Sequence, residues 1–508
     1  VIYMNPRVWR NEILKYGKKR RVKIIFDWPQ MIFNRKLYIS FMRPLQLLFQ
    51  IFIFNKVFKY ILNQYRHFTD YNQISLVMNN SNNNNESDHP RIAVPYWGNL
   101  NLNCPDLQSD LFFLQNSNLS SNDFCLLFSL SIDPFDSKKQ SELKSFNIKP
   151  ICLSIKSTVI NSIEIINYDL INISEFEKKM SLITVNGKFS FFNKIWLNDQ
   201  LILYQKNYYY WLKRFKHHNV KVHINWYKHD ASHVAISAAI KLLGGISTIY
   251  QRSFDDSPYV LLATASDIVF SFSNDVNNDM EIGSVIPYHV AVGYVGDYRF
   301  DLIKEPAKNI RAKLKINGAK HIIAYFDENT ADDNRWFPGH ESIQKDYNYL
   351  LEKVLSCSWF GLILKPKVSW TIRKRLGNVV ETLDLAIQTG RCLIFESGKI
   401  QNSYPPSFAS LASDVAIAGH IYGGTAAFES ALSGKPTLIL DQDGWPKGNL
   451  YELGINNVIF NNWDILWNAC EDFFTSKNND NKLGDWSNKL NEWDPFRDGQ
   501  AAQRIGNY

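Results

Sequence analysis

The segment from Val415 to Leu440 constrains the fold of this chain more than any other. An apolar run, Val415–Ala418, leads into a Gly-rich turn, and a run of small residues then leads to Gly434 and a second apolar run, Thr437–Leu440. Short apolar runs are typical of buried strands, and a glycine often ends a helix. The order therefore predicts a strand, a turn, a helix and a second, parallel strand.

The turn within this segment has the features of an anion site. Gly423, Gly424 and Thr425 stand where the predicted helix begins, and backbone N–H groups at a helix N-terminus bind phosphate. Glu429, five residues after Gly424, is placed to reach a ribose hydroxyl, and His420 is placed to bond a phosphate or a base. The alternatives are a tight connection that holds no ligand and a histidine that is packed at a strand end.

Short apolar runs alternate with helical stretches along much of the chain. This alternation predicts an α/β protein with two Rossmann-like, doubly wound parallel-sheet domains that face a cleft. The expected strands lie at 91–94, 124–130, 151–155, 220–226, 246–250, 265–272, 321–326, 359–364, 392–395, 415–418 and 437–440, with helices at 231–243 and 341–356.

The two halves share a short pattern, since Ala265–Val269 is similar to Ala412–Ala416. Two sheets of the same construction would give such a match. An Asn-rich, low-complexity stretch separates the α/β region from what precedes it. We expect a basic, apolar and helical N-terminal extension at 1–78, a linker at 79–90, a first α/β domain at 91–310 and a second at 311–508.

Composition narrows the classes of partner. The net charge is +7, and basic residues concentrate between positions 7 and 23. Such a patch binds nucleic acid, an anionic membrane or an acidic polymer, or is simply solvated. No nucleic-acid-binding signature accompanies it, so we expect no nucleic-acid partner. The six cysteines form no Cys-x-x-Cys pair, which argues against a zinc site and favours a reducing, cytoplasmic compartment.

Residues 44–62 are rich in Leu, Phe and Ile, but polar residues interrupt them too often for a clear membrane-spanning helix. Two interpretations remain: an interfacial helix, or a helix packed on the main body. The first would place residues 1–65 in peripheral contact with the inner face of the plasma membrane. The chain begins at Val1 and ends at Tyr508 within a helical pattern, which suggests a fragment.

Candidate general bases follow a strand of the first domain. His229 and Asp230 follow the strand at 220–226, although Asp230 is also a plausible helix N-cap. Arg252, with the two acids that follow it at 255 and 256, is the second choice. Trp97, Gly98 and Asn99 follow the first strand, and we expect them to face the cleft. The alternative is that they only pack against the protein interior.

The second domain also places charged residues after its strands. Lys365 and Lys367 follow the strand at 359–364, and their charge would suit a phosphate, or they are solvated. Asp327 and Glu328 follow the strand at 321–326 and are placed to bind a cation or sugar hydroxyls, with loop solvation as the alternative.

With these motifs in view, the chain resembles GT-B fold glycosyltransferases, particularly bacterial surface-polysaccharide (capsule or O-antigen) biosynthesis proteins. The likeness covers about 91–508 as architecture and is motif-specific only over about 320–508. The segments that carry it are Tyr325–Asn329, Leu364–Lys367, Ala412–Asp414, Gly423–Ser430, Gly434–Pro436 and Asp494–Gly506.

The resemblance implies a nucleotide-sugar donor held mainly by the second domain, and a glycan or lipid-linked glycan acceptor held against the first. It implies no cofactor and no obligatory metal. The residues that would contact donor phosphate are Gly423, Gly424 and Thr425, with Glu429 on ribose or sugar hydroxyls and Lys365 and Lys367 at the cleft edge.

One departure concerns the stereochemical subclass. Many retaining enzymes of this fold carry two glutamates eight residues apart, whereas Glu429 has Ile421 eight before it and Thr437 eight after. This difference favours another subgroup. Two other enzymes remain as alternatives: a nucleotide-sugar 2-epimerase and a polymerase that uses a CDP-linked polyol donor. A third alternative is a binding or scaffold protein without catalysis.

Overall fold

The computed structural model describes most of the chain after residue 88. The predicted extension at 1–78, most of the linker at 79–90, and His229, Asp230 and Gly423 lie outside the described residues. The described ranges are 89–115, 117–128, 137–152, 191–226, 232–254, 264–274, 288–328, 339–396, 404–421, 424–442, 444, 448–476 and 482–508.

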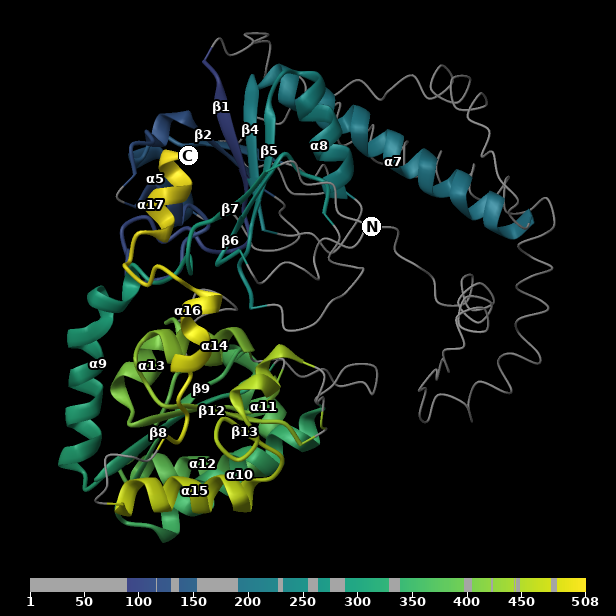
Figure 1. The fold of residues 1–508 in the computed structure, drawn as a ribbon. Coiled ribbons are helices and arrows are strands. Elements are labelled where there is room, and N and C mark those ends of the chain that lie inside the picture. Colours follow the sequence, from purple (N-terminus) through teal and green to yellow (C-terminus); the bar gives the residue numbers. More distant parts are fainter. Residues whose placement is uncertain are drawn as a thin grey trace.

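The first domain is built on a seven-stranded parallel sheet in the order β3-β2-β1-β4-β5-β6-β7 (Figure 1). Its strands are β1 Arg91–Pro95, β2 Phe124–Phe128, β3 Lys149–Cys152, β4 Val220–Asn225, β5 Ile246–Tyr250, β6 Ile268–Ser271 and β7 Tyr288–Ala291. Its helices are α5 Ser137–Ser145, α7 Phe191–His217 and α8 Ser232–Leu242.

The second domain is built on a six-stranded parallel sheet in the order β10-β9-β8-β11-β12-β13. Its strands are β8 His321–Phe326, β9 Phe360–Lys365, β10 Cys392–Ile394, β11 Val415–Ala418, β12 Thr437–Leu440 and β13 Ile459–Phe460. The helices that follow β7 are α9 Arg299–Ile316, α10 His340–Ser356, α11 Ile372–Leu376, α12 Val379–Gln388, α13 Pro406–Ala412, α14 Gly424–Leu432, α15 Trp463–Thr475, α16 Ser487–Trp493 and α17 Ala501–Asn507.

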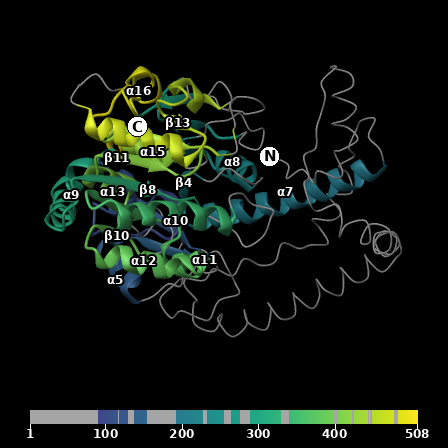
Figure 2. The same ribbon diagram turned by 90° about the horizontal axis from the view of Figure 1, so that it is seen from below.

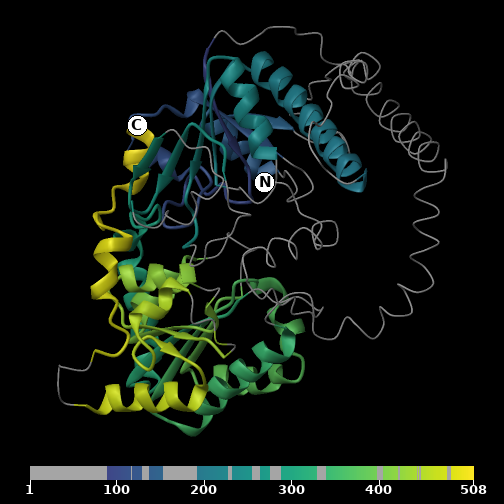
Figure 3. The ribbon, with the colours of Figure 1, turned by 45° about the vertical axis from the view of Figure 1, so that its right-hand side comes forward.

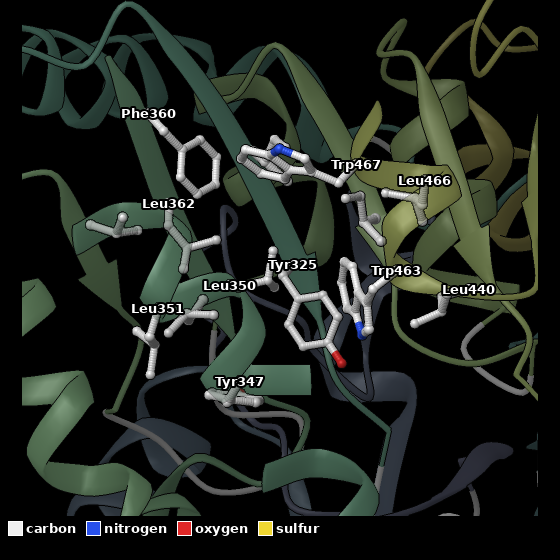
Figure 4. Close-up of a cluster of buried hydrophobic side chains, with 14 of the residues drawn as sticks. Tyr325, Tyr347, Leu350, Leu351, Phe360, Leu362, Leu440, Trp463, Leu466 and Trp467 are labelled. Atoms are coloured by element: carbon white, nitrogen blue, oxygen red, sulfur yellow. The ribbon is translucent and has the colours of Figure 1, made fainter. Parts of the chain in front are cut away.

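Strand β8 shows why such a sheet is covered on both faces. Its alternate residues Ile323 and Tyr325 lie in a core cluster with α10, α12 and α15 (Figure 4). Ile322 and Ala324 lie in another, with α9 and α13. A strand that is buried on both faces reads as a continuous apolar run. Figure 2 shows α10 and α12 next to each other on one side of this sheet. The predicted α/β class with two doubly wound parallel sheets is confirmed.

The short repeat predicted a shared construction, and the two copies make the same contacts. Asp267 accepts a hydrogen bond from the backbone N–H of Ser247 at 2.9 Å, and Asp414 accepts one from that of Ile322 at 2.8 Å. Each aspartate precedes a strand and fixes the start of its neighbour. These contacts lie at the amino ends of the strands, so the repeat is structural.

The last helix returns to the first domain (Figure 3). Ala502 and Ile505 of α17 are buried in the first domain's core, together with Phe112 and Phe113. Arg504 donates a hydrogen bond to the backbone carbonyl of Val292 at 3.0 Å. The chain therefore crosses between the domains at α9 and again before α17. In the part of the chain that the structure describes, no helix is both long and apolar enough to cross a membrane.

Candidate functional site

A cavity of about 320 Å³ lies between the two sheets. The carboxyl ends of strands from both domains converge on it, since Trp226 follows β4, Arg252 follows β5 and Asp327 follows β8. In open α/β sheets this edge is where ligands bind. Other residues that line it include Phe112, Tyr250, Tyr294, Tyr298, Arg299, Glu328, Lys365, Lys367, Thr425, Ala426 and Glu429.

The structure brings part of the predicted site together. Arg252, Lys365, Lys367, Thr425 and Glu429 all line the cavity. The predicted residues that do not line it, among those that the structure describes, are Trp97, Gly98, Asn99, His420 and Gly424.

Glu429 is the most heavily bonded of these residues. Its side chain is buried, and one carboxylate oxygen accepts hydrogen bonds from the backbone N–H of Ser407 at 3.0 Å and from its hydroxyl at 2.5 Å. The other oxygen accepts a hydrogen bond from the hydroxyl of Tyr294 and lies 3.9 Å from the guanidinium of Arg299. A carboxylate has about four acceptor positions, so capacity for a ligand hydroxyl is left.

The protonation of these partners follows from burial and charge. Burial, reinforced by the Glu429 carboxylate, raises the pKa of Tyr294 well above its ordinary value. The phenol therefore stays protonated and donates a hydrogen bond to that carboxylate. Burial opposes the charge of Arg299, but Glu429 together with Tyr298, Tyr294 and Asp297 raises the pKa of the guanidinium.

The start of α14 is held against the first domain. The hydroxyl oxygen of Thr425 accepts a hydrogen bond from the backbone N–H of Phe254 at 2.9 Å. A Cβ on Gly424 would lie 3.2 Å from Leu450 and 3.8 Å from Phe254, which leaves room for little more than hydrogen. The predicted phosphate turn thus borders the cavity and also forms part of the domain contact.

The second-domain wall pairs cations with acids. Lys365 is buried, and burial lowers its pKa to about 8, opposed by Asp327 and Glu429. Burial also raises the pKa of Asp327 to about 6. The ammonium of Lys367 pairs with Glu328. This wall carries positive charge that its own acids largely balance.

The loop after β1 supports the first-domain wall from behind. The buried carboxylate of Asp110 accepts hydrogen bonds from the backbone N–H groups of Trp97 at 2.7 Å and Asn99 at 3.1 Å. Between them Gly98 adopts a φ of +113°, which few other residues tolerate. The ring of Trp97 lies 5.1 Å from that of Trp226, which does line the cavity.

His420 lies elsewhere. It is buried close to Asp346, whose pKa is raised to about 6 by burial. The carboxylate of Asp346 accepts hydrogen bonds from Trp463 at 2.7 Å, Tyr325 at 3.0 Å and Gln442 at 3.0 Å. This buried cluster belongs to the interior of the second domain.

Several cavity residues escaped the sequence analysis. Tyr294, Tyr298 and Arg299 fall between β7 and the first turn of α9, two elements that the apolar pattern did not predict. Trp226 was recognised only as the end of a strand. The signal available for it was its position directly after β4. Among the described residues, no group of three or more His, Cys, Asp or Glu side chains could hold a metal ion.

No protein-family model matches this sequence, and no curated protein does. Among solved structures, MnaA from S. aureus in complex with UDP is similar at 11% identity over 82% of this chain and 94% of that one, with a TM-score of 0.46. The wall teichoic acid polymerase TagF matches at 13% identity over 88% and 96%, with a TM-score of 0.45. A UDP-GlcNAc 2-epimerase from Methanocaldococcus jannaschii matches at 12% over 82% and 98%, with a TM-score of 0.41.

At these identities and TM-scores the likenesses assign neither an activity nor site residues to this chain. What the chain's own fold and cavity define is a two-domain α/β protein with two doubly wound parallel sheets, whose carboxyl edges enclose a site lined by both basic and acidic side chains.

Proposed function

We propose that this chain is a glycosyltransferase that moves a sugar from a nucleotide-sugar donor to a glycan or lipid-linked glycan of a bacterial surface polysaccharide. The observation that carries the proposal is the cavity between the domains, because both sheets contribute the residues after their strands to it. A two-substrate reaction needs two binding walls that face one space, with each substrate held mainly by one domain.

The donor side is assigned to the second domain. Lys365, Lys367 and Thr425 line the cavity there, beside the first turn of α14. Ammonium groups and free N–H groups at a helix N-terminus together suit a diphosphate. Gly423 and Gly424 would let the phosphate approach the backbone, and Gly423 lies outside the described residues.

In the proposed reaction an acceptor hydroxyl oxygen attacks the anomeric carbon of the donor sugar. The bond from that carbon to the phosphate oxygen breaks, and the nucleoside diphosphate leaves with the electron pair. The hydroxyl proton passes to a general base, for which His229 and Asp230 remain the predicted residues. Cations on the second-domain wall stabilise the leaving phosphate, so the step itself requires no metal.

A thermal-shift series with UDP-, GDP-, CDP- and CMP-sugars tests donor binding. We expect one nucleotide class to raise the melting temperature, by an increment that grows with ligand concentration. Gly424→Val should abolish the shift, because the added methyl groups crowd the start of α14. Gly339→Ala is the matched control, since a Cβ there meets no atom within 4 Å. The absence of a shift with every nucleotide would contradict the enzyme assignment.

Product analysis then separates the activities. A transferase consumes the nucleotide sugar fully only when an acceptor glycan is added. An epimerase converts it without an acceptor, and a polyol-phosphate polymerase releases CMP from a CDP-linked donor. Either of these outcomes would replace glycosyl transfer as the function of the same cavity. Peripheral membrane contact through residues 1–65 remains a separate proposal, tested by co-sedimentation with anionic vesicles.

A further inference from the structure

Arg252 is a cation of the cavity that lacks a paired carboxylate among the described residues. It follows β5 on the first-domain wall, and its guanidinium carbon lies 4.4 Å from the centre of the Trp226 ring. Its Nη1 atom is shielded from solvent and has no hydrogen-bond partner. In the described parts of the chain, no carboxylate lies within ion-pair distance of it.

The other cations of the cavity differ in this respect. Arg299 lies 3.9 Å from the Glu429 carboxylate, and Lys367 pairs with Glu328. The ammonium of Lys365 donates a hydrogen bond to the backbone carbonyl of Pro366 at 3.3 Å, and the Asp327 and Glu429 carboxylates favour its charge. Among the described residues, a positive charge without a paired carboxylate therefore stands on the first-domain wall, opposite the wall that we assign to the donor.

Asp110 attracts Arg252 but does not form an ion pair with it. Asp110 attracts the guanidinium from a distance, but its carboxylate oxygens accept hydrogen bonds from the loop that holds Trp97 and Asn99. Burial lowers the pKa of Arg252 even so. A shielded guanidinium without a partner is costly to the folded protein, and a ligand that supplies an oxyanion removes that cost.

The surroundings of Arg252 indicate the chemistry of that ligand. A guanidinium matches a carboxylate or phosphate through two parallel hydrogen bonds. Trp226 and Tyr250 line the same wall, and aromatic surface of this kind packs well against a sugar ring. The wall thus combines an oxyanion position with apolar ring surface.

We propose that the first-domain wall recognises an acidic acceptor, in which a carboxylate or phosphate on the saccharide is bound by Arg252 beside Trp226. Only the identification of this ligand as the acceptor rests on the proposed transferase function. The anion site itself stands on the position and missing partner of Arg252. It makes Arg252 a residue that determines specificity for the second substrate.

The test compares three ligands that share one ring: glucose, glucuronic acid and glucose 6-phosphate. Each is titrated into the full chain by NMR or calorimetry, with and without saturating UDP. We expect at least one of the charged sugars to bind fivefold or more tightly than glucose, also when UDP is present. The carboxylate and phosphate arms show which oxyanion fits.

Variants of Arg252 connect this preference to the residue. Arg252→Gln should lower the affinity for the charged sugars to that for glucose. Arg252→Lys should keep part of the difference in affinity between the charged sugars and glucose. Both variants should bind UDP with an affinity within about twofold of that of the unaltered chain. Melting temperatures of both variants verify that they fold. Equal binding of the three sugars, or a preference that Arg252→Gln does not change, would overturn the inference. A tenfold loss of UDP affinity in Arg252→Gln would also overturn it, since Arg252 would then serve the donor.

The two proposals fail differently. If UDP does not bind the unaltered chain but the charged sugars do so through Arg252, the donor assignment is wrong and the anion site stands. If UDP binds and the charged sugars show no preference, the donor assignment stands and the acidic acceptor is wrong.

Discussion

The hydroxyl of Tyr294, in the first domain, donates a hydrogen bond to the carboxylate of Glu429, in the second. Glu429 also accepts from Ser407 and lies near Arg299, so one carboxylate joins two helices of the second domain to the segment that enters it. The residue that sequence analysis singled out for a ribose therefore also holds the cavity's walls together. Substitutions at Glu429 will consequently report on both stability and binding.

The first prediction concerns this bond. Tyr294→Phe removes the hydroxyl and leaves the buried Glu429 with one donor fewer, so we expect the free energy of unfolding to fall by about 1–3 kcal/mol. Urea denaturation of the full chain measures it. Tyr508→Phe is the matched control, because Tyr508 is exposed and should change stability by less than about 0.5 kcal/mol. A double-mutant cycle with Glu429→Gln should show coupling, and strict additivity would speak against the bond.

The second prediction concerns Thr425 as a link between the domains. Thr425→Val keeps the shape but leaves the backbone N–H of Phe254 without its acceptor, so we expect a loss of about 1–3 kcal/mol. Thr425→Ser restores the oxygen and should recover most of it. Chemical denaturation of the unaltered chain and the two variants measures the free energies of unfolding. A loss for serine with none for valine would show that the methyl group, and not the hydrogen bond, matters.

The third prediction is a pH dependence of nucleotide binding. Burial lowers the pKa of Lys365 to about 8, so its charge is present below that pH and lost above it. The affinity for UDP should therefore decrease between pH 7 and pH 9.5, by up to about tenfold for one lost charge contact. Calorimetric titration across this range measures the effect. Lys365→Arg should flatten the profile, and an unaltered chain with a flat profile would remove Lys365 from the donor site.

The fourth prediction concerns Asp297, where α9 enters the second domain. Burial, together with the nearby Asp494 and Asp498, raises its pKa to about 7 from 3.8, although the backbone N–H of Gly499 donates to it at 2.9 Å. The folded state holds this proton more tightly than the unfolded state. Stability from this group is therefore complete below about pH 4 and is lost as the pH rises towards 7.

Asp297→Asn tests this expectation, since the amide oxygen can still accept from Gly499. We expect the variant to gain melting temperature relative to the unaltered chain as the pH rises from 5 to 8. Asp301→Asn, on the exposed side of α9, should show no such trend. If the difference between Asp297→Asn and the unaltered chain does not depend on pH, Asp297 is ionised in the fold throughout.

Local pattern was enough to predict the fold class. Strand β8 was expected at 321–326 and lies at His321–Phe326, and the segment from β11 to β12 has its predicted strand, helix and strand. Parallel strands buried on both faces leave apolar runs that are visible without any partner. The same pattern indicated Arg252 and Lys365 as residues of the candidate site, because the residues after parallel strands share one edge of a sheet.

Elements without such a run were missed. Strand β7 reads Tyr288–Ala291 and is only partly buried, and α9 carries many charged residues on its exposed side. Tyr294 and Arg299 lie beside these elements, so their approach to the cavity was not visible. The return of α17 to the first domain was also not visible, because its apolar residues fit either domain equally well by composition.

By itself, the sequence determined the order of the strands that carry apolar runs, the two parallel sheets and the edge at which a ligand would bind, since these follow from periodicity and chain direction. The tertiary structure alone decided which side chains meet across the domains. It turned Glu429 towards Tyr294 and Ser407, placed Trp97 behind Trp226, and left Nη1 of Arg252 without a hydrogen-bond partner among the described residues. Such pairings depend on distances between residues far apart in the chain, and no local pattern encodes them.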